Sequence, residues 1–130
     1  MPFAQWSDSL SLGVKAIDDQ HKQLIQMLNE LSDAFDSPDR ESVIATCLTQ
    51  MKQYSQQHFI DEEKLMKDNS YPDLEEHIKE HEVFIDKASA YKAAQLELYL
   101  PFQDMLDFLK EWLVDHITVS DQKYATFMKE

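Results

Sequence analysis

The chain has 130 residues, of which 43% are hydrophobic and 28% charged, a balance typical of one globular domain with a buried core. Its formal net charge of −13 would repel phosphate backbones and anionic lipid headgroups, which argues against nucleic-acid and membrane-surface partners. No D-x-D-x-D-G loop accompanies the acidic residues, so a calcium-binding loop of that type is excluded.

The cellular compartment is indicated by the cysteine content and by the segments that the sequence lacks. Cys47 is the only cysteine, so no internal disulfide can form, which is typical of a reducing compartment. The N-terminal segment has no basic region followed by an apolar run, and no apolar run approaches the ~20 residues that span a bilayer. We therefore expect a cytoplasmic protein without membrane insertion.

Prolines divide the chain into four stretches with helical periodicity. One glycine and four prolines are too few for a turn-rich β fold, and Pro38, Pro72 and Pro101 separate stretches in which apolar residues recur at steps of three and four. These stretches predict helices over approximately 18–36, 40–68, 73–93 and 98–117.

Four amphipathic helices with short connections predict an all-α fold, an up-down-up-down antiparallel four-helix bundle. An irregular N-terminal arm precedes the first helix and runs to about Ala16, and the residues after Asp121 predict a short C-terminal helix. We expect residues 1–130 to form a single domain.

All the histidines lie where core residues are expected. Each falls on the apolar stripe of its helix, and every predicted helix contributes at least one: His21, His58, His77, His81 and His116. Glu62 lies on the same stripe one turn after His58, whereas the neighbouring Glu63 points off the stripe and is expected at the surface. Because a buried polar group without a partner costs several kcal/mol, these side chains require a compensating partner.

The spacing of these residues indicates a metal as that partner. His58 and Glu62, like His77 and His81, are four residues apart, so each pair shares one helix face about 6 Å apart along the axis. Imidazole and carboxylate ligate borderline metals such as Fe, Zn or Mn. Five imidazoles with one or two carboxylates are too many for one tetrahedral zinc, and they suit two irons bridged by carboxylates.

The spacing of Asp121 permits a role as a ligand but does not require it. Asp121 follows His116 by five residues, which in a regular helix places it ~140° away around the axis. It can join the same site only if the helix ends or bulges between the two residues. The intervening segment 117–120 holds three β-branched residues and a serine and is a weak helix former, which permits this geometry without requiring it.

Together these motifs resemble the hemerythrin family, in particular its single-domain bacterial type. The resemblance extends from Trp6 to Phe127. It rests on Ile17-Asp18-Asp19-Gln20-His21, His58-Phe59-Ile60-Asp61-Glu62-Glu63, the pair His77 and His81, and Trp112-Leu113 ahead of His116-Ile117 and Asp121.

The resemblance implies a non-haem di-iron centre, with two iron ions per chain joined by an oxo or hydroxo bridge and with O2 as the exogenous ligand. One iron would be held by His77, His81 and His116. The other would be held by His21 and His58, which leaves it a vacant position, and Glu62 and Asp121 would bridge both. The apolar pocket for O2 would be lined by Leu24, Phe59, Trp112, Leu113 and Ile117.

The implied function is reversible O2 binding for transport, storage or delivery to an oxygen-consuming enzyme, and the chain itself is expected not to be an enzyme. The alternatives are a di-iron oxidase or peroxidase, or a sensor of O2 or redox state, using the same site. Carboxylate-rich di-iron enzymes carry E-x-x-H motifs on two helices, and no histidine here follows a glutamate by three residues. This absence favours the O2-binding protein over the enzyme.

Overall fold

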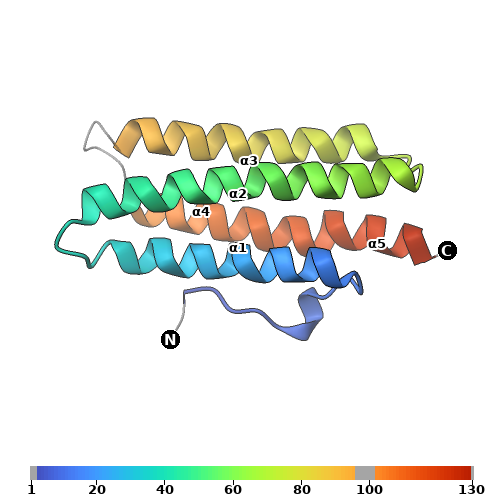
Figure 1. Ribbon diagram of the computed structural model, residues 1–130, viewed down its shortest axis with the longest axis horizontal. Coiled ribbons are helices and arrows are strands. Elements are labelled where there is room, and N and C mark those ends of the chain that lie inside the picture. The colour runs from blue at the N-terminus through green and yellow to red at the C-terminus, as the bar shows by residue number, and fades with distance from the viewer. Residues whose placement is uncertain (1–2, 96–101, 130) are drawn as a thin grey trace.

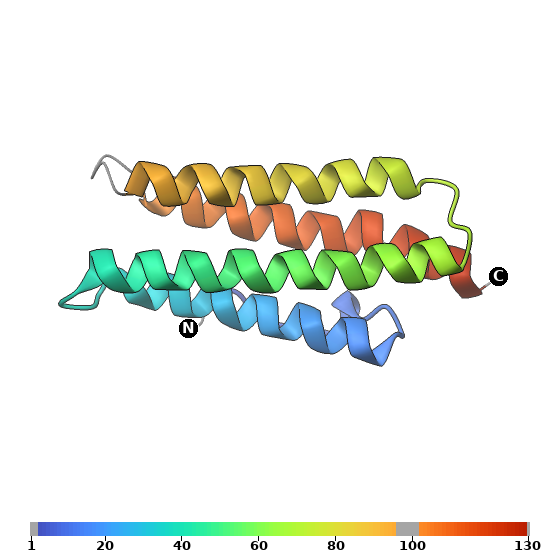
Figure 2. The same cartoon turned by 45° about the horizontal axis from the view of Figure 1, so that its top comes forward.

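The computed structural model describes residues 3–95 and 102–129. Its long helices are α1 (Lys15–Ala34), α2 (Arg40–Asp68), α3 (Leu74–Gln95) and α4 (Phe102–Asp115). Successive helices run in opposite directions with their axes nearly aligned (Figures 1 and 2). The described ranges contain no strand, so the predicted all-α four-helix bundle is confirmed.

Three shorter helical segments complete the described chain. A 3-10 helix, η1 (Asp8–Leu10), lies in the N-terminal arm, a π-helix, η2 (His116–Asp121), continues α4, and α5 (Gln122–Lys129) follows without a break. The arm lies alongside α1 in Figure 1. Its backbone is fixed there because Ala4 and the Asn29 side chain exchange two hydrogen bonds of 2.7 and 2.8 Å.

The first helix begins at Lys15, earlier than the predicted residue 18, and Asp18 lies inside its first turn. The Asp18 carboxylate accepts hydrogen bonds from the Leu12 backbone N–H at 2.8 Å and from Ser11 Oγ at 2.6 Å. This carboxylate therefore joins the arm to the helix, and its charge suits the positive end of the helix dipole. The predicted start of the fourth helix at residue 98 lies outside the described residues.

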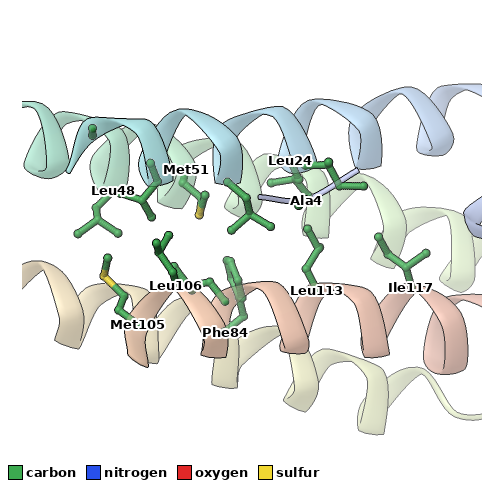
Figure 3. Packing of buried hydrophobic residues seen from close by; sticks show 14 of the residues in the cluster. Ala4, Leu24, Leu48, Met51, Phe84, Met105, Leu106, Leu113 and Ile117 are labelled. Atoms are coloured by element: carbon green, nitrogen blue, oxygen red, sulfur yellow. The ribbon is translucent and has the colours of Figure 1, made fainter. Parts of the chain in front are cut away.

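The apolar core forms two clusters along the bundle. The larger cluster contains most of the inward leucines of α1, α2 and α4, and Figure 3 shows Leu24 and Leu113 pointing toward each other within it. The smaller cluster lies nearer the start of α1 and includes Ile17, Met66 and Tyr124. On α1, His21 falls between Ile17 of the smaller cluster and Leu24 of the larger one, so the histidines occupy a layer between the two clusters.

The helices are amphipathic around these clusters rather than uniformly apolar. No helix in the described part of the chain is long and apolar enough to cross a membrane.

Candidate metal centre

The structure brings all the predicted metal ligands together in the layer between the two core clusters. Each is at least nine-tenths buried: His21, His58, Glu62, His77, His81, His116 and Asp121. Within this layer, two sets of side chains have potential ligand atoms within 4.8 Å of one another. One set is Glu62, His77, His81, His116 and Asp121, and the other is His21, His58 and Glu62. The two sets divide the histidines three to two, and Glu62 belongs to both.

Two carboxylates occupy the middle of this layer. Asp121 lies 3.1 Å from His21 Nε2, 3.0 Å from His77 Nε2 and 3.1 Å from His116 Nε2. Glu62 lies 2.9 Å from His58 Nε2 and 3.6 Å from the Nε2 atom of His81. Each carboxylate therefore contacts histidines of both sets, which is the position a bridging ligand requires.

Asp121 reaches the site because the chain forms a π-helix between His116 and Asp121. A π turn closes hydrogen bonds between residues five apart, so side chains five residues apart fall on one face. The sequence allowed either a helix end or a bulge here, and the structure has the bulge. The Thr118 hydroxyl donates to the Val114 carbonyl at 2.8 Å, which satisfies a backbone group where the hydrogen-bonding pattern changes.

Many of the inward atoms of the site lack hydrogen-bond partners. Among the described residues, the buried unpartnered atoms include both ring nitrogens of His21, Nε2 of His77, Oε1 of Glu62 and both carboxylate oxygens of Asp121. Each such atom costs about 1–3 kcal/mol if nothing compensates it. The Asp121 carboxylate and the Nε2 atoms of His21 and His77 lie within ion-pair distance but without hydrogen-bond geometry. Their lone pairs therefore point toward the same small space. Imidazole nitrogens and carboxylate oxygens are donors that iron accepts, and the residues present therefore fit a metal centre.

Burial and charge set the protonation of these histidines in the metal-free chain. Burial lowers the pKa of His81 to about 3 despite the nearby Glu62 carboxylate, so this imidazole is neutral, the form that ligates a metal. Although burial opposes the change, Asp121 and Glu80 raise the pKa of His116 to about 10. The histidines around Asp121 overcome its burial and hold its pKa well below the usual range. A metal at this site would replace the proton on His116.

Comparison with known proteins identifies the family. The family model of the hemerythrin HHE cation binding domain matches residues 12–128 of this chain. The chain belongs to the hemerythrin family. It is 35% identical over 133 residues to a bacteriohemerythrin of Stenotrophomonas maltophilia, with 99% of this chain and 84% of the relative covered.

Further relatives support the hemerythrin assignment. A myohemerythrin of Theromyzon tessulatum is 33% identical over 120 residues, with 92% of this chain and 89% of the relative covered. The crystal structure of a wild-type hemerythrin superposes with a TM-score of 0.88 at 27% identity, covering 98% of this chain and 99% of that one. The resemblance inferred from the sequence is therefore confirmed.

Polar side chains around the hemerythrin site hold three of its imidazoles from outside. His58 Nδ1 bonds to Gln20 Oε1 at 2.6 Å, His81 Nδ1 to Glu63 Oε2 at 2.8 Å, and His116 Nδ1 to Glu80 Oε1 at 3.0 Å. Because Nδ1 donates outward in each case, Nε2 is left to face the site.

The expectation that Glu63 is simply exposed was wrong. Its side chain is 27% exposed, and its carboxylate accepts the His81 bond. Gln20 directly precedes His21, and Glu63 directly follows Glu62. This adjacency in the sequence was the only sign that either residue could contact the site. The helical stripe did not reveal them, because they lie at its flank and bond across to a neighbouring helix.

Aromatic and aliphatic residues cover the side of the site that faces the larger core cluster. Phe59 stacks on the His81 ring with centroids 3.9 Å apart, and Trp112 stacks on the His116 ring at 4.5 Å. The other three residues of the predicted pocket, Leu24, Leu113 and Ile117, are buried in that cluster (Figure 3). The structure thus places all five predicted pocket residues in one apolar region that adjoins the histidine layer.

Tyr124 of α5 is a site residue that the sequence analysis missed. Its hydroxyl is buried and donates to Glu62 Oε2 at 2.6 Å. Burial, followed by the charge of Glu62, raises the pKa of Tyr124 far above its usual value, so the hydroxyl remains a donor. The C-terminal helix was predicted, but the length and period of this short tail gave no sign that one of its residues reaches across to α2.

Replacing Tyr124 by phenylalanine is expected to lower the free energy of unfolding by about 1.5–3 kcal/mol, because a buried carboxylate loses a hydrogen bond to its charged oxygen. Urea unfolding of the metal-free and metal-loaded protein measures the change. Tyr71→Phe is the matched control, because Tyr71 packs in the same cluster and its hydroxyl forms no hydrogen bond within the described chain. Equal losses in the two variants would show that the bond to Glu62 contributes nothing.

Proposed function

We propose that the chain binds O2 reversibly at a non-haem di-iron centre, for oxygen transport, storage or delivery to an oxygen-consuming enzyme. The observation that carries the proposal is the position of Asp121 and Glu62, each of which contacts histidines of both sets. His77, His81 and His116 would hold one iron and His21 and His58 the other, with the two carboxylates shared between them. Two bound iron ions would supply the electrons for reversible binding of O2.

The unequal number of histidines supports binding of an exogenous ligand on one side. The set with His21 and His58 offers one imidazole fewer than the other set. The apolar residues Leu24, Phe59, Trp112, Leu113 and Ile117 adjoin the histidine layer and restrict access of water and anions to it. Gln20, Glu63 and Glu80 fix the orientation of three imidazoles, so the site keeps its shape when the ligand leaves.

The same donor set favours a carrier over an enzyme. Five imidazoles with two carboxylates differ from the carboxylate-rich sites of di-iron enzymes on similar bundles, which use E-x-x-H motifs on two helices. We therefore infer that the chain is not itself a catalyst, with O2 and an oxygen-consuming enzyme as its partners.

The test is a visible absorption spectrum of the anaerobically reduced protein, with iron counted per chain. The spectrum is recorded before air is admitted, after air is admitted and after O2 is removed. Two irons per chain and an absorption band that appears with O2 and disappears on its removal would support the proposal. Immediate oxidation that does not reverse would indicate an oxidase, a peroxidase or a redox sensor, and a chain that binds no iron would refute the centre itself.

A further inference from the structure

One buried hydroxyl stands apart from the proposed ligands. Among the described residues, every buried side-chain oxygen or nitrogen without a hydrogen-bond partner belongs to the metal site, except Oγ of Ser55. Ser55 is 0% exposed. An unpartnered buried hydroxyl is costly, so its position calls for a physical reason.

Ser55 differs in this respect from several other hydroxyls inside α2 and α3. A serine or threonine inside a helix commonly donates to the carbonyl four residues earlier. Thr46, Thr49 and Ser89 all do so, at 3.0, 2.9 and 2.8 Å. Ser55 makes no such bond and therefore keeps its hydroxyl hydrogen available.

The position of Ser55 is fixed by the packing of α1 against α2. Ser55 lies on the buried stripe of α2, three residues before His58, about 4.5 Å along the helix axis. The His21 and His58 rings are 4.8 Å apart and set the register of the two antiparallel helices. Because the helices are antiparallel, Ser55, three residues before His58, is expected at the level of Leu24, three residues after His21.

The position of Leu24 indicates where Ser55 lies relative to the apolar region. Figure 3 shows Leu24 pointing toward Leu113, and both belong to the pocket residues named above. By this register, the buried Ser55 hydroxyl falls at the level of the apolar residues on the side of His21 and His58.

We propose that the Ser55 hydroxyl donates a hydrogen bond to a small ligand bound on the His21 and His58 side of the centre. The inference rests on the proposed function and adds a selectivity determinant to it. An apolar wall selects small ligands by size and excludes water, whereas a single donor favours those whose outer atom carries negative charge. Ser55 thus stabilises a diatomic or triatomic ligand with partial negative charge, such as O2 that shares electrons with the centre or the azide anion.

The test compares Ser55→Ala with Ser55→Thr in the iron-loaded protein. Azide is titrated into the oxidised protein and followed by its visible absorption, and O2 dissociation from the reduced protein is timed by stopped flow. Loss of one hydrogen bond to a charged acceptor predicts on the order of tenfold weaker azide binding and faster O2 release in Ser55→Ala. Ser55→Thr retains the hydroxyl and is expected to restore both values to near wild type.

A second readout separates this role from a structural one. Because the hydroxyl has no partner within the protein, Ser55→Ala is expected to leave the unfolding free energy of the metal-free chain unchanged or higher. If alanine at this position impairs folding, threonine and valine provide the same comparison, because they match in shape and differ in the hydroxyl.

The outcomes distinguish this inference from the proposed function. Wild-type protein that binds no O2 would contradict the proposed function. Wild-type protein that binds O2, with azide affinity and O2 release unchanged in Ser55→Ala, would overturn the role of Ser55 alone. In that case the hydroxyl has no part in binding the ligand.

Discussion

Replacing Asp121 by alanine is expected to abolish tight binding of both proposed metal ions. The Asp121 carboxylate lies within 3.1 Å of His21 in one set and His77 in the other, so its loss affects both sets at once. Metal content after desalting is expected to fall from two ions per chain to less than one. Removing one partner of a buried charged pair also costs about 3–5 kcal/mol, so the metal-free variant should unfold at lower urea concentration.

Asp115→Ala provides the control for this experiment. Asp115 is an exposed residue of the same type at the end of α4, six positions earlier in the chain. Its replacement should leave metal content and stability close to those of the wild type. Two ions retained by the Asp121→Ala variant after desalting would refute the bridging role of Asp121.

His77→Ala is expected to remove one iron, or the whole centre, and with it the stability that metal binding gives. His77 belongs to the set with three imidazoles, and its Nε2 atom is buried without a hydrogen bond. Because metal binding free energy is coupled to folding, the difference in Tm between loaded and metal-free protein should shrink. Iron analysis and thermal unfolding, each with and without metal, measure both effects.

Lys79→Ala controls for a change at the same turn of α3, because Lys79 is exposed and lies outside the site. His58→Ala makes the reciprocal change in the other set. Two tightly held irons in His77→Ala, with O2 binding unchanged, would show that His77 is not a ligand.

The fold and most of the site were predictable because helical periodicity is a property of the local sequence. An apolar stripe identifies the inward face of each helix, and a histidine on that stripe must point to the interior once the helices pack. This reasoning placed His21, His58, His77, His81 and His116 in one layer, where the structure has them. The pairing of Glu62 with His58 followed from the same rule.

The remaining features depend on contacts that a stripe does not encode. The weak helix formers at 117–120 were compatible with either a helix end or a bulge, and only packing against the other helices selects the π turn that carries Asp121 inward. Glu80 lies at a helix flank, and its contact with His116 depends on how α3 packs against α4 and η2. Tyr124 reaches Glu62 across 62 positions of the chain, so its role depends on the placement of α5.

The π-helix η2 also bears on how the buried histidine layer could open. Turns closed between residues five apart are rare and are found mostly as single turns, and the helix that continues beyond η2 is only eight residues long. We therefore expect residues 116–129 to detach from the bundle at a lower free energy than global unfolding. Detachment would withdraw Asp121 and Tyr124 together, so we expect any metal ions held at the site to leave when this segment opens, while α1, α2 and α3 stay packed. The rate of metal loss should accordingly follow amide hydrogen exchange in this segment rather than the unfolding rate of the bundle.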